Sequence, residues 1–274
     1  MPYVRRKWLL ATVIALLLLC GVTSLSAEQS STRILFDFRT DSHPGPVKRG
    51  SLIPLKTQRE ILSTLFPKYL NNEDACKPEN AQQPSDNATL QAQRENGQIV
   101  PSIDTFLDGS FTAPRTRQTA YFIKVGECFA STSSYWGTYR LAIFEGSRLV
   151  ANVSPQVGTH GDWQANGIAT AADVNNDGMD ELLLVAIAFG MGEVEEKAGL
   201  VSLRSGKLET IRGFDSVYDN PCASQNPDRV TASVIAYSST HLFVDEYEAP
   251  CHGDAAKGKV PSLADFKPVP QSHQ

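Results

Sequence analysis

The alternation of apolar and polar residues in the second half of the chain most restricts what it can fold into. Residues 121–125 and 139–143 repeat every two positions, as strands with one buried face do. The run Leu182–Phe189 is continuously apolar and of strand length, which predicts a strand buried on both faces. Two further strand pairs, 200–211 and 230–247, each enclose a short polar turn. These patterns predict a series of antiparallel hairpins.

The hairpins resemble one another in sequence. Arg140–Leu149 and Gly199–Leu208 align at a separation of 59 residues, and both contain an apolar strand, a tight turn, a basic residue and a leucine in that order. Val234–Phe243 is a looser third copy. Such repetition favours propeller-like blades or a meandering sheet. About 150 strand-rich residues suffice for roughly three blades, whereas a closed propeller usually has at least four. We therefore expect a mainly β fold in a partial or atypical β-propeller-like arrangement, with one short N-terminal helix.

One helix is predicted near the start of the chain. Thr57 and Glu60 have the spacing of a capping box, and Ile61, Leu62, Leu65 and Tyr69 follow on one helical face. Pro67 should kink or end the helix near Phe66. Residues 28–55 have no sustained period and predict an extended or partly disordered lead-in. Residues 71–98 are so poor in apolar side chains that they predict a loop. We divide the chain into 1–27, a signal peptide, 28–98, the lead-in with its helix and loop, and 99–274, the β domain.

The first residues indicate export. Arg5, Arg6 and Lys7 precede the uncharged apolar run Trp8–Val22, and small residues around Ala27 suit a signal peptidase. The run is shorter than the roughly 20 residues that a membrane-spanning helix needs, which favours cleavage over a retained anchor. The chain has 25 basic and 30 acidic residues, and cleavage would remove three basic residues and no acid. The resulting charge of about −8 excludes nucleic acid and anionic membrane surfaces as favoured partners, because both require lysine and arginine clusters. We expect a secreted or periplasmic protein, with an unidentified protein or glycan as its partner and no membrane association after cleavage.

The cysteines agree with an oxidising compartment. Cys20 leaves with the signal, and Cys76, Cys128, Cys222 and Cys251 remain, an even number that suggests two disulfides. Three pairings are possible. The pairs Cys76–Cys128 and Cys222–Cys251 close the shorter loops and are favoured.

Asp173–Glu181 is the strongest chemical signal. Calcium binds six to eight oxygens, mainly from carboxylates, carbonyls and water. Oxygen-bearing side chains at 173, 175 and 177 can converge if the loop curls, and Gly178 permits the sharp reversal that follows. The Met179 carbonyl and Glu181 can complete the shell. A plain Asn/Asp/Gly turn is the alternative, but four carboxylates in nine residues would repel one another without a cation.

The pattern Asp-x-Asn-x-Asp-Gly-x-x-acid followed by an apolar strand resembles the calcium loop of FG-GAP and VCBS repeats, the units of integrin-like propellers. An EF-hand fits less well, because its twelfth position would be Leu184 and a helix would have to follow. The resemblance covers about Ile168–Phe189. It implies Ca²⁺ as the cofactor, with the side chains of Asp173, Asn175, Asp177 and Glu181 and the carbonyl of Met179 as ligands. Glu stands where the family more often has Asp, and the other hairpins lack the acidic loop.

No catalytic constellation is recognisable. The chain has no Gly-x-Ser-x-Gly and no His-Glu-x-x-His motif. We therefore expect a non-enzymatic protein with a structural calcium site, an interaction or adhesion module of unknown role. The alternative is an exported hydrolase of polysaccharide or peptide that uses a pair of acids facing each other across a cleft.

Overall fold

The computed structural model describes residues 32–40, 46–66, 101–131, 134–190, 193–223, 229–238, 241–253, 255–257 and 259–270. These belong to one compact unit that begins at Thr32. The predicted signal peptide, and the predicted loop at 71–98, lie outside the described residues. Among those that are described, no helix is long and apolar enough to cross a membrane.

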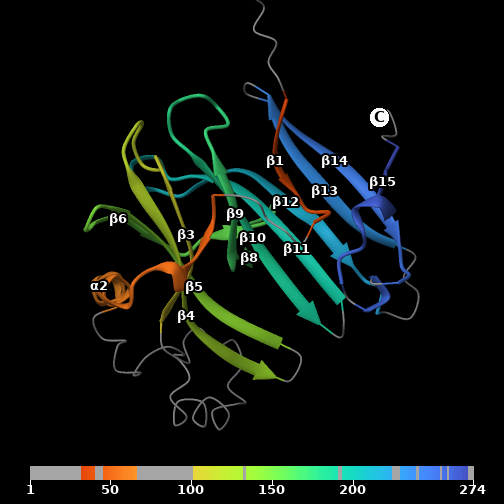
Figure 1. Ribbon diagram of the computed structural model, residues 1–274, viewed down its shortest axis with the longest axis horizontal. Helices are drawn as coiled ribbons and strands as arrows, with labels where there is room; N and C mark the ends of the chain where they lie inside the picture. The colour runs from red at the N-terminus through yellow and green to blue at the C-terminus, as the bar shows by residue number, and fades with distance from the viewer. Residues whose placement is uncertain are drawn as a thin grey trace, which may run out of the picture. The chain divides into compact units, whose positions relative to one another are not determined.

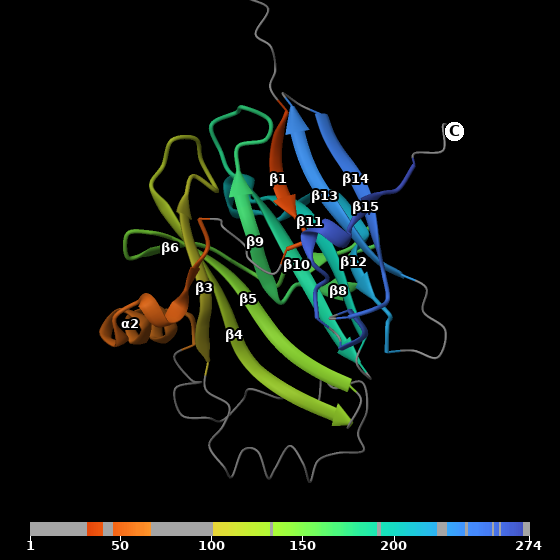
Figure 2. The same ribbon diagram turned by 45° about the vertical axis from the view of Figure 1, so that its right-hand side comes forward.

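Two antiparallel sheets make up most of the unit (Figures 1 and 2). The five-stranded sheet has the order β2 (Lys48–Arg49), β3 (Ser102–Gly109), β4 (Gln118–Ser131), β5 (Ser134–Glu145) and β6 (Arg148–Val153). The larger sheet runs β15 (Lys267–Pro268), β14 (His241–Pro250), β13 (Arg229–Ser238), β12 (Glu209–Asn220), β11 (Glu193–Ser202), β10 (Glu181–Gly190) and β9 (Gly167–Ala172), with β1 (Arg33–Asp37) paired to β13. A small hairpin joins β7 (Gln156–Val157) to β8 (Trp163–Gln164). Short 3-10 turns occupy Gly50–Leu52, Arg204–Gly206, Ala255–Lys257 and Leu263–Asp265.

The predicted fold class is confirmed: the protein is mainly β, with antiparallel hairpins in a partial propeller-like arrangement and one short helix. The larger sheet curls, because β1 pairs with β13 and also contacts β9 near the other end of the same sheet. The three related hairpins form β5–β6, β11–β12 and β13–β14. They are distributed over two sheets, so the arrangement does not close into a ring of separate blades.

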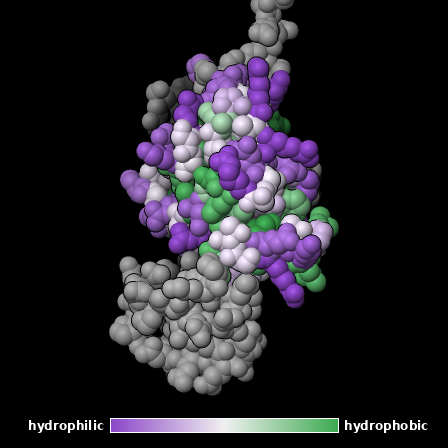
Figure 3. All heavy atoms as spheres, turned by 90° about the vertical axis from the view of Figure 1, so that its left-hand side faces the viewer, coloured by the Kyte–Doolittle hydropathy of each residue, from purple (hydrophilic) through white to green (hydrophobic). Residues whose placement is uncertain are grey.

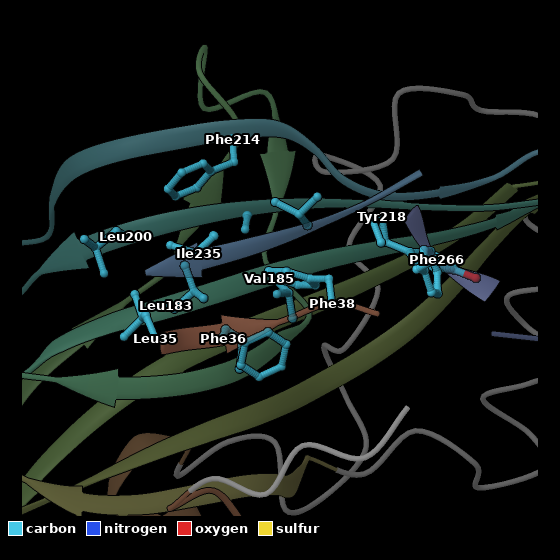
Figure 4. Packing of buried hydrophobic residues seen from close by; sticks show 14 of the residues in the cluster. Leu35, Phe36, Phe38, Leu183, Val185, Leu200, Phe214, Tyr218, Ile235 and Phe266 are labelled. Carbon is cyan, nitrogen blue, oxygen red and sulfur yellow. The ribbon is translucent and has the colours of Figure 1, made fainter. Parts of the chain in front are cut away.

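The curled sheet surrounds one hydrophobic core. Side chains from β1, β10, β11, β12 and β13 converge inside it, among them Phe36, Val185, Leu200 and Ile235 (Figure 4). A second core lies between the two sheets, where Phe122 and Leu141 of the smaller sheet meet Leu182 and Leu184 of β10.

β10 is therefore buried on both faces, as its apolar run predicts. Leu183 and Val185 face the core inside the curl, while Leu182 and Leu184 face the core between the sheets. The end of the strand differs, because Phe189 is 72% exposed.

On the face shown in Figure 3, hydrophilic side chains predominate and the hydrophobic areas between them are small.

The helix α2 (Leu55–Leu65) packs on the smaller sheet through Ile61 and Leu62. The predicted capping box is wrong. Pro54 precedes the helix without a side-chain cap, and Thr57 lies inside the first turn. Proline already restricts the backbone there, and the Gln58 side-chain amide donates to the Ile53 carbonyl at 2.7 Å, which ties the helix start to the preceding turn. The helix ends before Phe66, as predicted.

Part of the predicted lead-in is a strand of the larger sheet. In β1, a bulge between Ile34 and Phe36 directs two successive side chains, Leu35 and Phe36, into the core. This bulge breaks the two-residue period, and for that reason the sequence pattern did not indicate a strand.

One predicted disulfide is present. Cys222 and Cys251 are bonded, with their Cα atoms 5.3 Å apart. Cys76 and the side chain of Cys128 lie outside what the structure describes, so that pairing stays a prediction.

Candidate metal centre

The acidic loop connects two neighbouring antiparallel strands. Its first acid follows β9, and Glu181 opens β10 directly opposite Ala172. Because β10 is buried on both faces, the loop starts and ends at fixed points at the junction of the two sheets. All five predicted ligand residues belong to this one loop, as sequence reasoning requires.

Side-chain oxygens curl the loop by accepting hydrogen bonds from its own backbone. The Asp173 carboxylate accepts from the amides of Asp177 at 3.0 Å and Gly178 at 2.9 Å. The Asn175 side-chain oxygen also accepts from the Asp177 amide, at 2.9 Å, and Asp177 Oδ1 accepts from the Met179 amide at 2.9 Å. Asp173, Asn175 and Asp177 therefore each turn at least one side-chain oxygen toward the backbone of the bend.

The chain reverses direction at Gly178, as the sequence predicts. Gly178 has φ +84°, a conformation that L side chains rarely adopt. Asn176 has φ 58°, which asparagine tolerates better than most residues.

Glu181 is the most unusual member of the loop, because it is an acidic residue that is only 1% exposed. One oxygen accepts from the Val174 amide and the other from the Asn175 side-chain amide, both at 3.0 Å. Burial raises the pKa of Glu181 to about 7 despite the hydrogen bond from Val174, and the negative charges of Asp177 and Asp173 add to the rise. A buried carboxylate facing two other acids is a place where a cation would be stabilising.

Met179 places its side chain in the core, 4% exposed. Its carbonyl oxygen accepts no hydrogen bond from any described residue, so this acceptor remains available to another partner.

The fourth acid, Asp180, points away from the loop. Its carboxylate accepts from the Ser110 amide at 2.8 Å, and its own amide donates to the Ser110 carbonyl at 2.7 Å. The Arg115 amide donates to the Gly178 carbonyl at 3.2 Å. These contacts tie the loop to the connection between β3 and β4, so the loop links the two sheets.

Sequence reasoning missed one charged contact. The guanidinium of Arg204, in the turn between β11 and β12, donates to Asp177 Oδ2. Arg204 and Asp177 are 27 residues apart in the chain, and no local pattern connects them. In the sequence, Arg204 was marked only as part of the tight turn that the related hairpins share.

The donor set fits calcium in its chemistry. It consists of carboxylate, amide and carbonyl oxygens, which a hard cation prefers, and one of the carboxylates already pairs with the Arg204 guanidinium. Each carboxylate oxygen has two acceptor positions, so the bonds to loop amides do not exhaust them. No three His, Cys, Asp or Glu side chains in the described ranges converge closely enough to hold a metal ion as they stand. An ion in this loop would therefore require some of these side chains to change orientation.

A second row of acids lies on the larger sheet. Glu195 of β11 is the cross-strand partner of Asp219 of β12. Asp219 is in turn paired with Thr231 of β13, and Thr231 with Glu248 of β14. Burial, and then the charge of Glu193, raises the pKa of Asp219. Cross-strand partners share one face of the sheet, so these acids do not face each other across a cleft as a hydrolase requires.

A comparison with protein-family models finds no match, and searches of curated proteins and of solved structures find none either. The likeness to FG-GAP and VCBS repeats therefore rests on the loop residues alone.

Proposed function

We propose that this chain is an exported, non-enzymatic β protein whose loop Asp173–Glu181 holds one structural calcium ion. The observation that carries the proposal is the buried carboxylate of Glu181, which faces Asp173 and Asp177 and has a pKa raised to about 7. The side chains of Asp173, Asn175, Asp177 and Glu181 and the Met179 carbonyl would hold the ion.

The ion would supply positive charge and would take no part in catalysis. It would relieve the repulsion among three acids and keep the bend closed, and the contacts to Ser110 and Arg115 would carry that order to the smaller sheet. The role is stabilisation of the junction between the sheets, in a protein that presents its surface to a protein or glycan partner in the secreted or periplasmic space.

The expected stabilisation is modest. Calcium sites of extracellular modules bind at roughly 10⁻⁴–10⁻³ M. With about 2 mM calcium and a dissociation constant of about 0.1 mM, binding adds about 1.8 kcal/mol to the free energy of unfolding. For a domain of this size, that corresponds to a rise in melting temperature of about 4–7 °C.

Thermal melts in calcium and in chelator test the proposal. The wild-type protein should show the rise, and Asp177→Ala should not. Asp180→Asn is the matched control, because it removes a charge from the same loop but outside the ligand set, so it should lower both melts and keep the calcium-dependent difference. Magnesium at the same concentration should produce a smaller rise, because it is smaller and gives up its water reluctantly.

The proposal fails if calcium leaves the wild-type melt unchanged, or if Asp177→Ala retains the full shift. The alternative, an exported hydrolase, is tested separately. Its test is the presence of two acids facing each other about 5–10 Å apart across a cleft, with loss of turnover when either is replaced by its amide.

A further inference from the structure

Arg204 is a cation placed against the candidate site by a different part of the chain. Its guanidinium donates to Asp177 Oδ2, while Asp177 Oδ1 is used within the loop by the Met179 amide. Arg204 therefore occupies the Asp177 oxygen that the loop amides leave unused, which is the oxygen for which an ion in the loop would compete.

The backbone that carries Arg204 is fixed. The next residue, Ser205, has φ 56° and donates its amide to the Thr112 carbonyl at 3.1 Å. Gly206 has φ +75°, and a Cβ there would come within 2.9 Å of the Val150 carbonyl. The turn that carries Arg204 is thus bonded to the connection between β3 and β4 and closely packed against β6.

The side chain itself is free to leave. The Arg204 side chain is 59% exposed and that of Asp177 is 27% exposed. An ion pair of this exposure contributes little and can open into water at small cost. A fixed backbone with a releasable charge is what a reversible counter-charge requires.

We propose that Arg204 is an internal counter-charge that competes with calcium for Asp177. Without calcium, Arg204 partly neutralises the loop. With calcium, the two positive charges repel and the side chain moves into solvent. This inference rests on the proposed calcium site and adds that Arg204 lowers its affinity, so that the loop fills only at high calcium.

Loss of the Arg204 charge should affect the calcium-free and the calcium-bound protein differently. Replacing Arg204 with Gln should destabilise the calcium-free protein, because the acids lose their counter-charge. It should leave the calcium-saturated protein nearly unchanged, because the arginine has already left. By linkage, a variant that is destabilised only without calcium binds calcium more tightly.

The experiment is a calcium titration of the mature chain by calorimetry, with melts of the same samples in calcium and chelator. Arg204→Gln should lower the calcium dissociation constant by about three- to tenfold, and Arg204→Lys, which keeps the charge, should remain close to wild type. Arg229→Gln is the matched control. It removes an arginine that pairs with Glu248 at nearly the same exposure, 55% and 32%, on a distant strand pair. Its calcium affinity should match the wild type.

The outcomes separate the two proposals. If the wild type binds calcium and Arg204→Gln binds it equally or more weakly, the competition is overturned and the calcium site stands. If Arg229→Gln tightens binding as much as Arg204→Gln, only net charge is acting and the competition is likewise overturned. If neither the wild type nor Arg204→Gln binds calcium, both proposals are overturned.

Discussion

The carboxylate of Glu181 accepts a hydrogen bond from the Val174 amide at 3.0 Å, which joins the first residue of β10 to the start of the loop before it. This bond spans the bend that contains Asp173, Asp177 and Glu181, and Glu181 is buried there. The account of the site depends on this arrangement, because burial of a carboxylate near like charges makes the loop sensitive to protons and to cations alike.

We predict that the calcium-free protein loses stability as the pH rises from 5 to 8. Burial raises the pKa of Glu181 from an ordinary 4.5 to about 7, so the folded state favours the protonated form. The stabilisation is fully present below pH 4.5 and is lost as the pH rises through about 7. Melts of metal-free protein at both pH values measure this, and Glu181→Gln should show a smaller difference.

Calcium should reverse that trend, because bound carboxylates must be ionised. The calcium-dependent rise in melting temperature should therefore be larger at pH 8 than at pH 5. An equal rise at both pH values would mean that Glu181 does not take part.

A second prediction concerns Asn166, whose side-chain amide pairs with the backbone of β10 as a neighbouring strand would. Its amide donates to the Ile187 carbonyl at 2.8 Å and its oxygen accepts from the Ile187 amide at 2.9 Å. Asn166→Ala should lower the free energy of unfolding by about 1–3 kcal/mol, because both Ile187 groups lose their partner. Urea denaturation measures the loss. Asn152→Ala, at an exposed position in β6, should change stability by less than about 0.5 kcal/mol.

A third prediction tests the close approach of two backbones. A Cβ at Gly213 would lie 2.3 Å from the Gly158 carbonyl oxygen, so Gly213→Ala must push the loop before β8 away from β12. We expect a loss of about 1–3 kcal/mol, the usual cost of overpacking. Gly190→Ala is the control, since a Cβ there meets nothing within 4 Å. Equal melting temperatures for the two variants would contradict the close approach.

A fourth prediction concerns the Cys222–Cys251 disulfide, which closes a sequence separation of 29 residues. Replacing both cysteines with alanine should reduce the free energy of unfolding by about 3–4 kcal/mol through the loop entropy regained by the unfolded chain. Chemical denaturation under oxidising conditions measures it. Unchanged stability would contradict a stabilising role for this bond.

Sequence reasoning found the elements whose periodicity reflects simple burial. β10 was recognisable because its apolar run is buried from both sides, and the hairpin β5–β6 because Gly146, with φ +60°, permits its tight turn. β3 was not singled out, although Ile103 and Leu107 do point to buried positions. β1 was missed because its bulge places two neighbouring residues in the core.

The candidate site was predictable only in its local part. The loop residues follow one another in the chain, so their spacing indicated a curled, oxygen-rich bend. Asp180 shows the limit of local sequence patterns. The composition of the loop suggested that Asp180 adds a fourth charge to it, yet the Asp180 carboxylate bonds to the Ser110 amide, 70 residues away. Arg204 reaches Asp177 only because the folded sheets bring two turns together.

The most direct measurement is equilibrium dialysis of metal-free mature protein against calcium at micromolar to millimolar concentrations. The account predicts uptake of about one ion per chain with half-saturation at roughly 10⁻⁴–10⁻³ M, and its loss when Asp173, Asp177 and Glu181 are replaced by their amides. No uptake at millimolar calcium, or equal uptake by the triple variant, would contradict it.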